Sequence, residues 1–217
     1  MQNNVWLKFF TDTARSTGLT LSEKQSALFL RYMLELLEWN RSTNLTRIVE
    51  PRDIAIKHFI DSMLITSHIK ISHKEIADIG SGGGFPGIPL AILDPSCKFV
   101  LIESLRKKTS FLKHIIRTLQ LDNVQVYNGR AQSFPAPATF DLAISRAFAS
   151  LSNFTTIAAQ LIKPQGSIVC MKGPLPREEI KELEEQKISG FCIDTHSYCL
   201  PEQGGERSLV VLQSCFT

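Results

Sequence analysis

The segment Asp78–Gly87 constrains the fold of this chain most, because glycine occupies five of its ten positions. It lies between two apolar runs, Glu75–Ile79 and Lys98–Glu103, and the second run ends in an acid. Several glycines in one turn cost conformational entropy unless the backbone must approach something closely. A glycine-rich turn after a buried strand, with a carboxylate at the tip of the next strand, is typical of an open parallel sheet that binds an adenine nucleoside.

Short apolar runs alternate with helical patterns through the rest of the chain after residue 75. The expected strands are Glu75–Ile79, Lys98–Glu103, Val124–Tyr127, Asp141–Ser145, Ser167–Lys172, Gly190–Tyr198 and Arg207–Cys215. The expected helices between them are Pro86–Leu93, Leu105–Leu119, Leu151–Leu161 and Arg177–Gln186. Such alternation predicts an α/β fold with a seven-stranded, mostly parallel sheet and helices on both faces. The last two strands have only a turn between them, so we expect an antiparallel hairpin at one edge.

Residues 1–70 are expected to form a helical extension packed on the domain of residues 71–217. Ser22 and Gln25 fit a capping box, which predicts a helix from Ser22 to about Trp39. Pro51 is tolerated in a first helical turn, and the apolar positions that follow it predict a second helix to about Ser67.

Cysteine usage and the apolar runs indicate in which compartment the protein is expected. The five cysteines are never spaced CxxC and mostly lie in apolar runs, which favours a reducing compartment and no metal site. The first residues fit no signal peptide, and no apolar run approaches the roughly 20 residues that span a bilayer. We therefore expect a cytoplasmic protein without a membrane partner, and a monomer.

The glycine turn is compatible with two cofactor classes. Gly82–Gly87 matches GxGxxG, which leaves a dinucleotide-dependent dehydrogenase open. Asp78, however, stands two residues before Gly80, where a carboxylate would repel a pyrophosphate but could accept hydrogen bonds from an ammonium group. S-adenosylmethionine carries an ammonium group and no phosphate. Asp78, Gly80, Gly82 and Gly84 are therefore candidate binding residues for it, and Glu103 suits the ribose hydroxyls of either cofactor.

Blocks spread along the chain resemble one known family. They are Trp39-Asn40, Asn44-Leu-Thr46, His58-Phe-Ile-Asp-Ser62, Asp78-Ile-Gly-Ser-Gly-Gly-Gly-Phe-Pro-Gly-Ile-Pro-Leu90, Ser145-Arg-Ala-Phe-Ala-Ser-Leu151, Lys172-Gly173 and Gly205-Glu-Arg207. Together, from about residue 20 to 212, they are similar to the small-subunit ribosomal RNA methyltransferase G family, also called glucose-inhibited division protein B. The resemblance implies a class I methyltransferase (Rossmann-like) fold. It also implies methyl transfer from S-adenosylmethionine to N7 of one guanosine in 16S ribosomal RNA, free or in the small ribosomal subunit.

The resemblance also assigns positions around the cofactor. Gly80 and Phe85 would line its methionine side, Ala131 and Gln132 would flank the adenine, and Arg146 would complete the pocket. Gln132 stands where the family often has an acid, so an amide oxygen would make the contact to the adenine amino group. Ser81 stands where threonine is common.

The chemistry expected of the residues agrees with an N7 target. Guanine N7 carries an in-plane lone pair, so transfer needs positioning rather than a general base or a covalent enzyme intermediate. Methylation of an amino group typically uses an Asn/Asp-Pro-Pro-aromatic block, whereas this chain has Ser145-Arg-Ala-Phe148 after its fourth strand. Methylation of cytosine C5 needs a cysteine nucleophile, but Cys170 is expected in the middle of a strand.

Four residues are candidates for the reaction itself: Arg146, His58, Asp61 and Lys172. Arg146 is expected at the carboxyl end of the fourth strand, where it could grip a phosphate or the guanine O6, or simply pair with an acid. His58 and Asp61 have the i, i+3 spacing of helix neighbours and could face each other, or merely form a self-paired helix face.

Local charge favours an RNA partner. Between Leu105 and Leu121 there are five basic residues and no acid: Arg106, Lys107, Lys108, Lys113 and Arg117. Arg41, Arg47, Arg52 and Lys57 likewise outnumber nearby acids. Segregated basic helices can bind phosphates, although an ordinary solvated face has the same pattern. A non-catalytic S-adenosylmethionine-binding ribosome assembly factor stays the alternative function.

Overall fold

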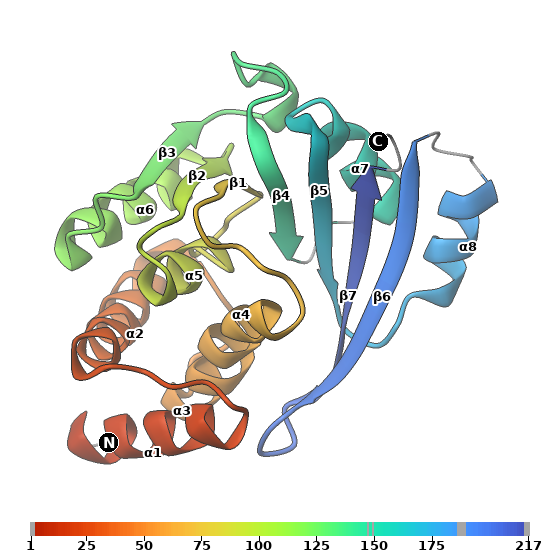
Figure 1. Ribbon diagram of the computed structural model, residues 1–217. Helices are drawn as coiled ribbons and strands as arrows, with labels where there is room; N and C mark the ends of the chain where they lie inside the picture. Colours follow the sequence, from red (N-terminus) through yellow and green to blue (C-terminus); the bar gives the residue numbers. More distant parts are fainter. Residues whose placement is uncertain (1–2, 147, 149, 186–189, 215–217) are drawn as a thin grey trace.

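In the computed structural model, residues 3–146, 148, 150–185 and 190–214 are described, and they form one seven-stranded sheet covered by helices (Figure 1). Its strands are β1 (Glu75–Ile79), β2 (Lys98–Glu103), β3 (Val124–Asn128), β4 (Phe140–Arg146), β5 (Ile162–Lys172), β6 (Phe191–Leu200) and β7 (Gly205–Ser214). The strand order is β3-β2-β1-β4-β5-β7-β6. β1 to β5 are parallel, and β7 runs antiparallel to both β5 and β6. The predicted α/β fold with a hairpin at one edge is confirmed.

Alternating side chains along the strands fill two separate hydrophobic clusters, one on each face of the sheet. In β1, Ile76 belongs to the first cluster and Ala77 to the second. The first is covered by α1 (Asn3–Ser16), α2 (Glu23–Thr43), α5 (Gly87–Leu93) and α6 (Arg106–Leu119), together with the helical segment of residues 51–67. The second is covered by α7 (Leu151–Ala159) and α8 (Arg177–Glu185), with the short helix η3 (Ala131–Ser133) beside α7.

The N-terminal helices pack on the first face through aromatic rings. Trp6 and Phe10 of α1 stack with their centroids 5.0 Å apart, and Phe10 meets Phe29 of α2 at 5.1 Å. Both rings of α1 also approach Phe59. The capping box at Ser22 is present as predicted, and α2 continues past the expected end at Trp39 to Thr43. The helices of residues 1–70 thus share one cluster with the sheet, and their separation as a domain stays a prediction.

The segment after Pro51 is one continuous helical run with a wider π-helical turn inside it. It comprises α3 (Pro51–Ile54), the π-helical η1 (Ala55–Ile60), α4 (Asp61–Met63) and the 3-10 turn η2 (Leu64–Ser67). Its bounds agree with the predicted helix from Pro51 to about Ser67. The sequence did not indicate the π turn, which contacts β6.

Two expectations need correction. Strand β5 begins at Ile162, five residues before the expected start, because Pro164 and Gly166 interrupt the apolar pattern where the pairing with β4 shifts register. Among the cysteines, Cys192 is disulfide-bonded and Cys199 is exposed, although Cys97 and Cys170 are buried thiols as expected. The cysteine pattern is therefore no argument for a reducing compartment. Within the described residues, no helix has the length and apolar character needed to cross a membrane.

Candidate functional site

The glycine turn follows β1 at the carboxyl edge of the sheet and needs glycine for two different reasons. Gly80, Gly82 and Gly84 have φ angles of 75°, 59° and 95°, a region that side chains with a Cβ disfavour. At Gly84 a Cβ would also lie 2.5 Å from Cδ1 of Ile88 and 2.6 Å from the hydroxyl of Tyr32. At Gly80 it would meet no other side chain closer than 4.0 Å. The turn is therefore packed tightly behind Gly84 and open beside Gly80.

Asp78 lies directly behind this turn and is fully buried. Its Oδ2 accepts a hydrogen bond of 2.9 Å from the amide of Gly87, at the start of α5. Its Oδ1 has no hydrogen-bond partner among the described residues. Burial raises the pKa of Asp78 to about 7, against the opposing effect of the Gly87 amide. One oxygen of Asp78 therefore closes the turn. The other is a buried acceptor with no donor among the described residues, which is uncommon in folded proteins and leaves that oxygen able to accept a hydrogen bond from a ligand.

Glu103 ends β2 beside the turn and supports it from the other side. Its Oε2 accepts from the amide of Gly82 at 3.0 Å, and its Oε1 accepts from the amide of Leu105 at 2.9 Å. Each carboxylate oxygen can accept a further hydrogen bond. Glu103 thus shapes the glycine turn and keeps acceptor capacity for the predicted contact to ribose hydroxyls.

Arg146 ends β4, and its guanidinium group points to the face covered by the N-terminal helices. Nη1 donates to the carbonyl of Lys57 at 3.0 Å, and Nη2 lies 3.0 Å from Nδ1 of His58. The π turn explains the first contact, because the amide of Asp61 bonds to the carbonyls of Ile56 and His58. The carbonyl of Lys57 is thereby available to Arg146.

The guanidinium group also lies over an aromatic ring and close to an acid. Its Cζ is 4.8 Å from the centroid of the Phe85 ring, and its Nη1 is 3.7 Å from Oδ2 of Asp61. Burial lowers the pKa of Arg146, and Asp61 opposes that effect. The side chain remains 18% exposed. Arg146 therefore has an acid partner, as expected if it served only to form an ion pair. Its side chain nevertheless reaches the surface of the site.

His58 is buried and neutral. Burial is the main cause that lowers the pKa of His58 to about 3, and the charge of Arg146 adds to it. Because Arg146 can only donate, Nδ1 must accept, and Nε2 then carries the proton and donates to Oγ1 of Thr46 at 2.8 Å. The ring stacks on Phe85 with centroids 4.3 Å apart.

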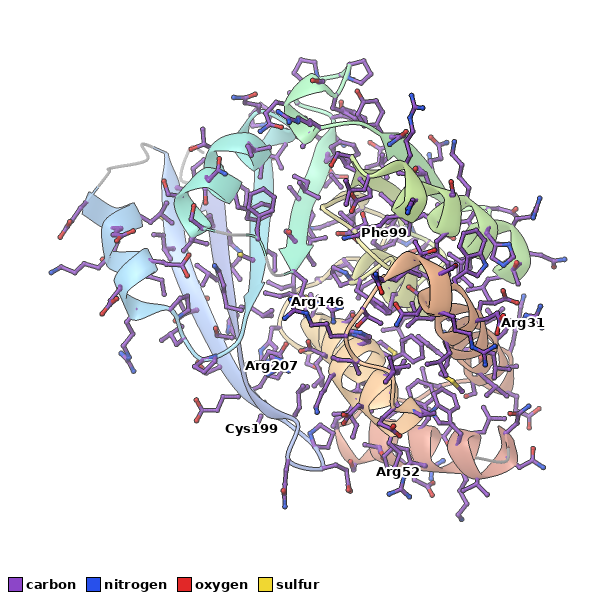
Figure 2. All side chains as sticks on the ribbon, turned by 180° about the vertical axis from the view of Figure 1, so that it is seen from behind. Arg31, Arg52, Phe99, Arg146, Cys199 and Arg207 are labelled. Atoms are coloured by element: carbon purple, nitrogen blue, oxygen red, sulfur yellow. The ribbon has the colours of Figure 1, made fainter. Side chains whose placement is uncertain are left out.

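Asp61 meets two residues of the C-terminal hairpin instead of His58. Its Oδ1 accepts from the hydroxyl of Tyr198 at 3.2 Å, and its Oδ2 lies 3.5 Å from Nε of Arg207. Burial raises the pKa of Asp61, while the guanidinium groups of Arg146 and Arg207 oppose it. Figure 2 shows Arg146 and Arg207 together where the sheet meets the N-terminal helices. His58 and Asp61 are therefore joined through Arg146.

Lys172 lies on the opposite face of the sheet from Arg146. Arg146 pairs in register with Met171, so the next residue of β5 points to the other side. Nζ of Lys172 contacts both oxygens of Glu179 at 3.0 and 2.8 Å, and Glu179 also accepts from the amide of Leu151. Lys172 thus joins β5 to α7 and α8, and it does not join the other three candidate catalytic residues.

The remaining predicted cofactor residues differ in their surroundings: two lie at the carboxyl edge of the sheet and one is buried among aromatic rings. Ala131 is buried and Gln132 is exposed in η3, which follows β3 at the same carboxyl edge. Phe85 is 4% exposed and its ring packs between Tyr32 and His58. The ring of Phe85 therefore packs against the guanidinium group of Arg146 and does not face open space.

Three residues that contact His58 or Asp61 were not predicted from the sequence: Thr46, Tyr198 and Arg207. Thr46 and Arg207 lie in blocks that carried the family resemblance, but the blocks gave them no role. Nothing in the sequence around Tyr198 marks it, because its partner Asp61 is 137 residues away along the chain.

Comparison with known proteins decides the family. The model of the family described as "rRNA small subunit methyltransferase G" matches residues 25–210. This chain belongs to that family. A relative named ribosomal RNA small subunit methyltransferase G from Vibrio atlanticus is 38% identical over 199 residues, covering 90% of this chain and 91% of its own length. Another of the same name, from Cronobacter sakazakii, is 37% identical and covers 96% of this chain and 98% of itself.

Solved structures agree on the fold of this methyltransferase G family member. A SAM-dependent methyltransferase from Aquifex aeolicus superposes with a TM-score of 0.58 at 15% identity, covering 82% of this chain and 98% of that one. The class I methyltransferase fold is confirmed. Membership in the family also confirms S-adenosylmethionine as the cofactor and a methyltransferase rather than a dehydrogenase.

Proposed function

We propose that the protein transfers a methyl group from S-adenosylmethionine to N7 of a specific guanosine in 16S ribosomal RNA. Membership in the methyltransferase G family supports ribosomal RNA as the substrate. The observation that carries the choice of N7 is that Arg146 occupies the Nδ1 lone pair of His58, so this histidine cannot accept a proton from a methylated base. We place the activity in the cytoplasm, in a monomer acting on 16S ribosomal RNA or on the small-subunit particle.

The residues of the glycine turn fit the cofactor. The unpartnered Oδ1 of Asp78 is an acceptor suited to an ammonium group, reached directly or through water. Glu103 offers carboxylate oxygens for the ribose, and Ala131 and Gln132 lie at the edge where the adenine is expected. The open side of Gly80 leaves room beside the backbone. When bound, the cofactor supplies a methyl group activated by the positive charge on sulfur.

Among the described residues, neither His58 nor Cys170 can supply the base or the thiolate that other methyl acceptors need. His58 cannot act as a base, because its Nδ1 lone pair is held by Arg146 and the pKa of His58 is lowered to about 3. Cys170 is buried in the middle of β5, and burial raises the pKa of its thiol to about 12. A cytosine C5 mechanism, which requires a thiolate, is therefore unsupported.

Transfer to N7 needs no proton movement. The lone pair of N7 forms the new bond to carbon while the bond between that carbon and sulfur breaks. The positive charge passes from sulfur to the purine, and S-adenosylhomocysteine leaves. The chain's task is to align the reacting atoms, and Arg146 is placed to hold a phosphate or the guanine O6 beside them.

The test is to incubate the purified protein, methyl-labelled S-adenosylmethionine and small-subunit particles that lack the modification. We expect label in 16S ribosomal RNA, confined to N7 of one guanosine. If the cofactor binds and no label reaches RNA, the protein is instead a non-catalytic, cofactor-binding assembly factor. Label on another atom would overturn the assignment of N7.

A further inference from the structure

Helix α6 carries a stripe of cations on its exposed face. At about 100° per residue, Arg106, Lys113 and Arg117 fall within about 40° of one another, and Lys107 lies about 100° around the axis from Arg106. All four are exposed, whereas Phe111 and its apolar neighbours on the opposite side are buried. We call Arg106, Lys107, Lys113 and Arg117 the α6 cation stripe.

The α6 cation stripe lacks acidic partners. None of its members forms an ion pair with any residue in the described part of the chain, and α6 itself contains no acid. On other helices, six exposed or half-buried cations each contact an acid three or four residues away: Lys8, Arg15, Arg31, Arg41, Lys57 and Lys181. Lys24, Arg52 and Arg177 are exposed on helices and, like the stripe, form no ion pair among the described residues, but each stands apart from other unpaired cations on its helix. The stripe therefore has its charge free for a partner.

The first two members of the stripe are placed against the dipole of the helix that carries them, whereas Arg117 lies in the last turn, where the dipole favours a cation. Arg106 and Lys107 occupy the first turn of α6, where the positive end of the helix dipole favours acids and disfavours cations. No acid offsets them in that turn. Two first-turn cations that cost helix stability are better explained by an anionic ligand than by an ordinary solvated face.

The stripe also begins beside the candidate site. Arg106 lies three residues after Glu103, whose carboxylate holds the glycine turn. From there α6 runs back along β2 and β3 (Figure 1). At about 1.5 Å per residue, the helix axis rises about 16 Å from Arg106 to Arg117. Arg130 is also exposed at this carboxyl edge, two residues after Asn128, whose side chain donates to the carbonyls of Glu103 and Ser104 just before α6.

We propose that the α6 cation stripe binds the sugar–phosphate backbone of the RNA that carries the target guanosine. The strand then runs from the crevice along the outer face of α6. This inference rests on the proposed function and extends it by assigning a surface on which the RNA substrate lies. A bilayer fits the stripe less well, because the apolar face of α6 is buried against the sheet and α2 and is not free to insert.

The test uses a variant at the end of the stripe farthest from the site, Lys113→Gln with Arg117→Gln. Its matched control is Arg177→Gln with Lys181→Gln, which removes one arginine and one lysine, also four residues apart, from the exposed face of α8 at the opposite end of the sheet. Each pair lowers the net charge by two. S-adenosylhomocysteine binding reports that both variants are folded.

We expect the α6 variant to raise the KM for small-subunit particles and the Kd for unmodified 16S ribosomal RNA transcript, with cofactor affinity unchanged. Removing two phosphate contacts reduces the slope of log Kd against log salt by about 1.4 to 1.8. Between about 50 and 200 mM salt, the ratio of variant to wild-type Kd should therefore shrink about seven- to twelvefold. The α8 control should keep the wild-type slope.

Equal slopes for the α6 variant and wild type would overturn the inference, as would an equal loss in the α8 control. Loss of binding to anionic vesicles with RNA binding unchanged would also overturn it, in favour of a membrane. These outcomes are measured by binding, so they stand apart from the proposed function. If wild-type protein bound RNA through α6 but methylated another atom, only the N7 assignment would fail.

Discussion

The Nη2 atom of Arg146 donates to Nδ1 of His58 across 3.0 Å and so ties the end of β4 to the π turn of the N-terminal helical segment. The same histidine donates from Nε2 to Thr46, whose backbone is held by the side chain of Asn40. A series of hydrogen bonds thus runs from the end of α2 to Arg146. We infer that it fixes the direction of the guanidinium group.

Thr46→Val should lower methyl transfer while leaving cofactor affinity unchanged. The variant removes the acceptor for the Nε2–H of His58, and a buried donor without a partner costs about 1–3 kcal/mol. The histidine would then release Arg146, so the loss should resemble that of Arg146→Ala in kind and be smaller. Single-turnover transfer and S-adenosylhomocysteine binding separate the two steps. Thr46→Ser keeps the hydroxyl and should restore transfer; wild-type transfer by Thr46→Val would refute the positioning role.

The buried neutral His58 should make the fold sensitive to acid. Because its pKa is lowered from 6.5 to about 3, the unfolded chain binds a proton in that interval and the folded chain does not. The free energy of unfolding should therefore fall as the pH drops from about 6.5 toward about 3. Denaturant titrations at several pH values measure this loss. His58→Gln should weaken the dependence, and an unchanged slope would show that His58 is not its source.

Asp78 should make cofactor binding weaken at low pH as well, over a higher pH range than the loss of stability through His58. Its pKa is raised from 3.8 to about 7 in the folded protein, so much of the carboxyl is protonated below that pH. A cofactor ammonium group favours the ionised form, so affinity should rise as the pH increases through about 7. Calorimetry with S-adenosylhomocysteine in two buffers of different ionisation enthalpy should also detect proton release. Asp78→Asn should bind weakly at every pH, and a flat wild-type profile would contradict the contact.

Alanine substitutions at Gly84 and Gly18 should distinguish the cost of a close contact from the cost of backbone strain. Both have positive φ, 95° and 85°, but an added Cβ meets Ile88 and Tyr32 at Gly84 and nothing within 4 Å at Gly18. Gly18→Ala should cost about 1–2 kcal/mol for the left-handed backbone alone. Gly84→Ala should cost about 1–3 kcal/mol more and also weaken cofactor binding. Thermal unfolding measures both, and equal losses would mean that the turn tolerates a side chain.

The elements of the fold were predictable from the sequence because each follows a local pattern. The apolar runs of β1 and β2 and the capping box at Ser22 agree with the structure within a residue. The start of β5 was wrong because Pro164 and Gly166 hide a strand that its neighbours complete. Local pattern cannot show pairing that is supplied by distant residues.

The positions of Asp78 and Glu103 beside the glycine turn were predictable, because each lies at the end of a strand with a clear apolar pattern, and their contacts to the cofactor stay predictions. The site was not predictable where side chains from distant elements meet. The sequence placed Lys172 among the candidate catalytic residues, but the register of β4 and β5 puts it on the other face from Arg146. Likewise, Tyr198 and Arg207 reach Asp61 only because the closing hairpin lies against the π-helical segment.

Methylation of a guanine nitrogen in small-subunit ribosomal RNA is the activity that we propose for this chain. The most direct measurement maps methyl groups on 16S ribosomal RNA from cells with and without the protein. We predict one N7-methylguanosine that disappears with the protein and returns when wild-type protein, but not Arg146→Ala, is supplied. Identical methylation maps in both kinds of cell would contradict the account.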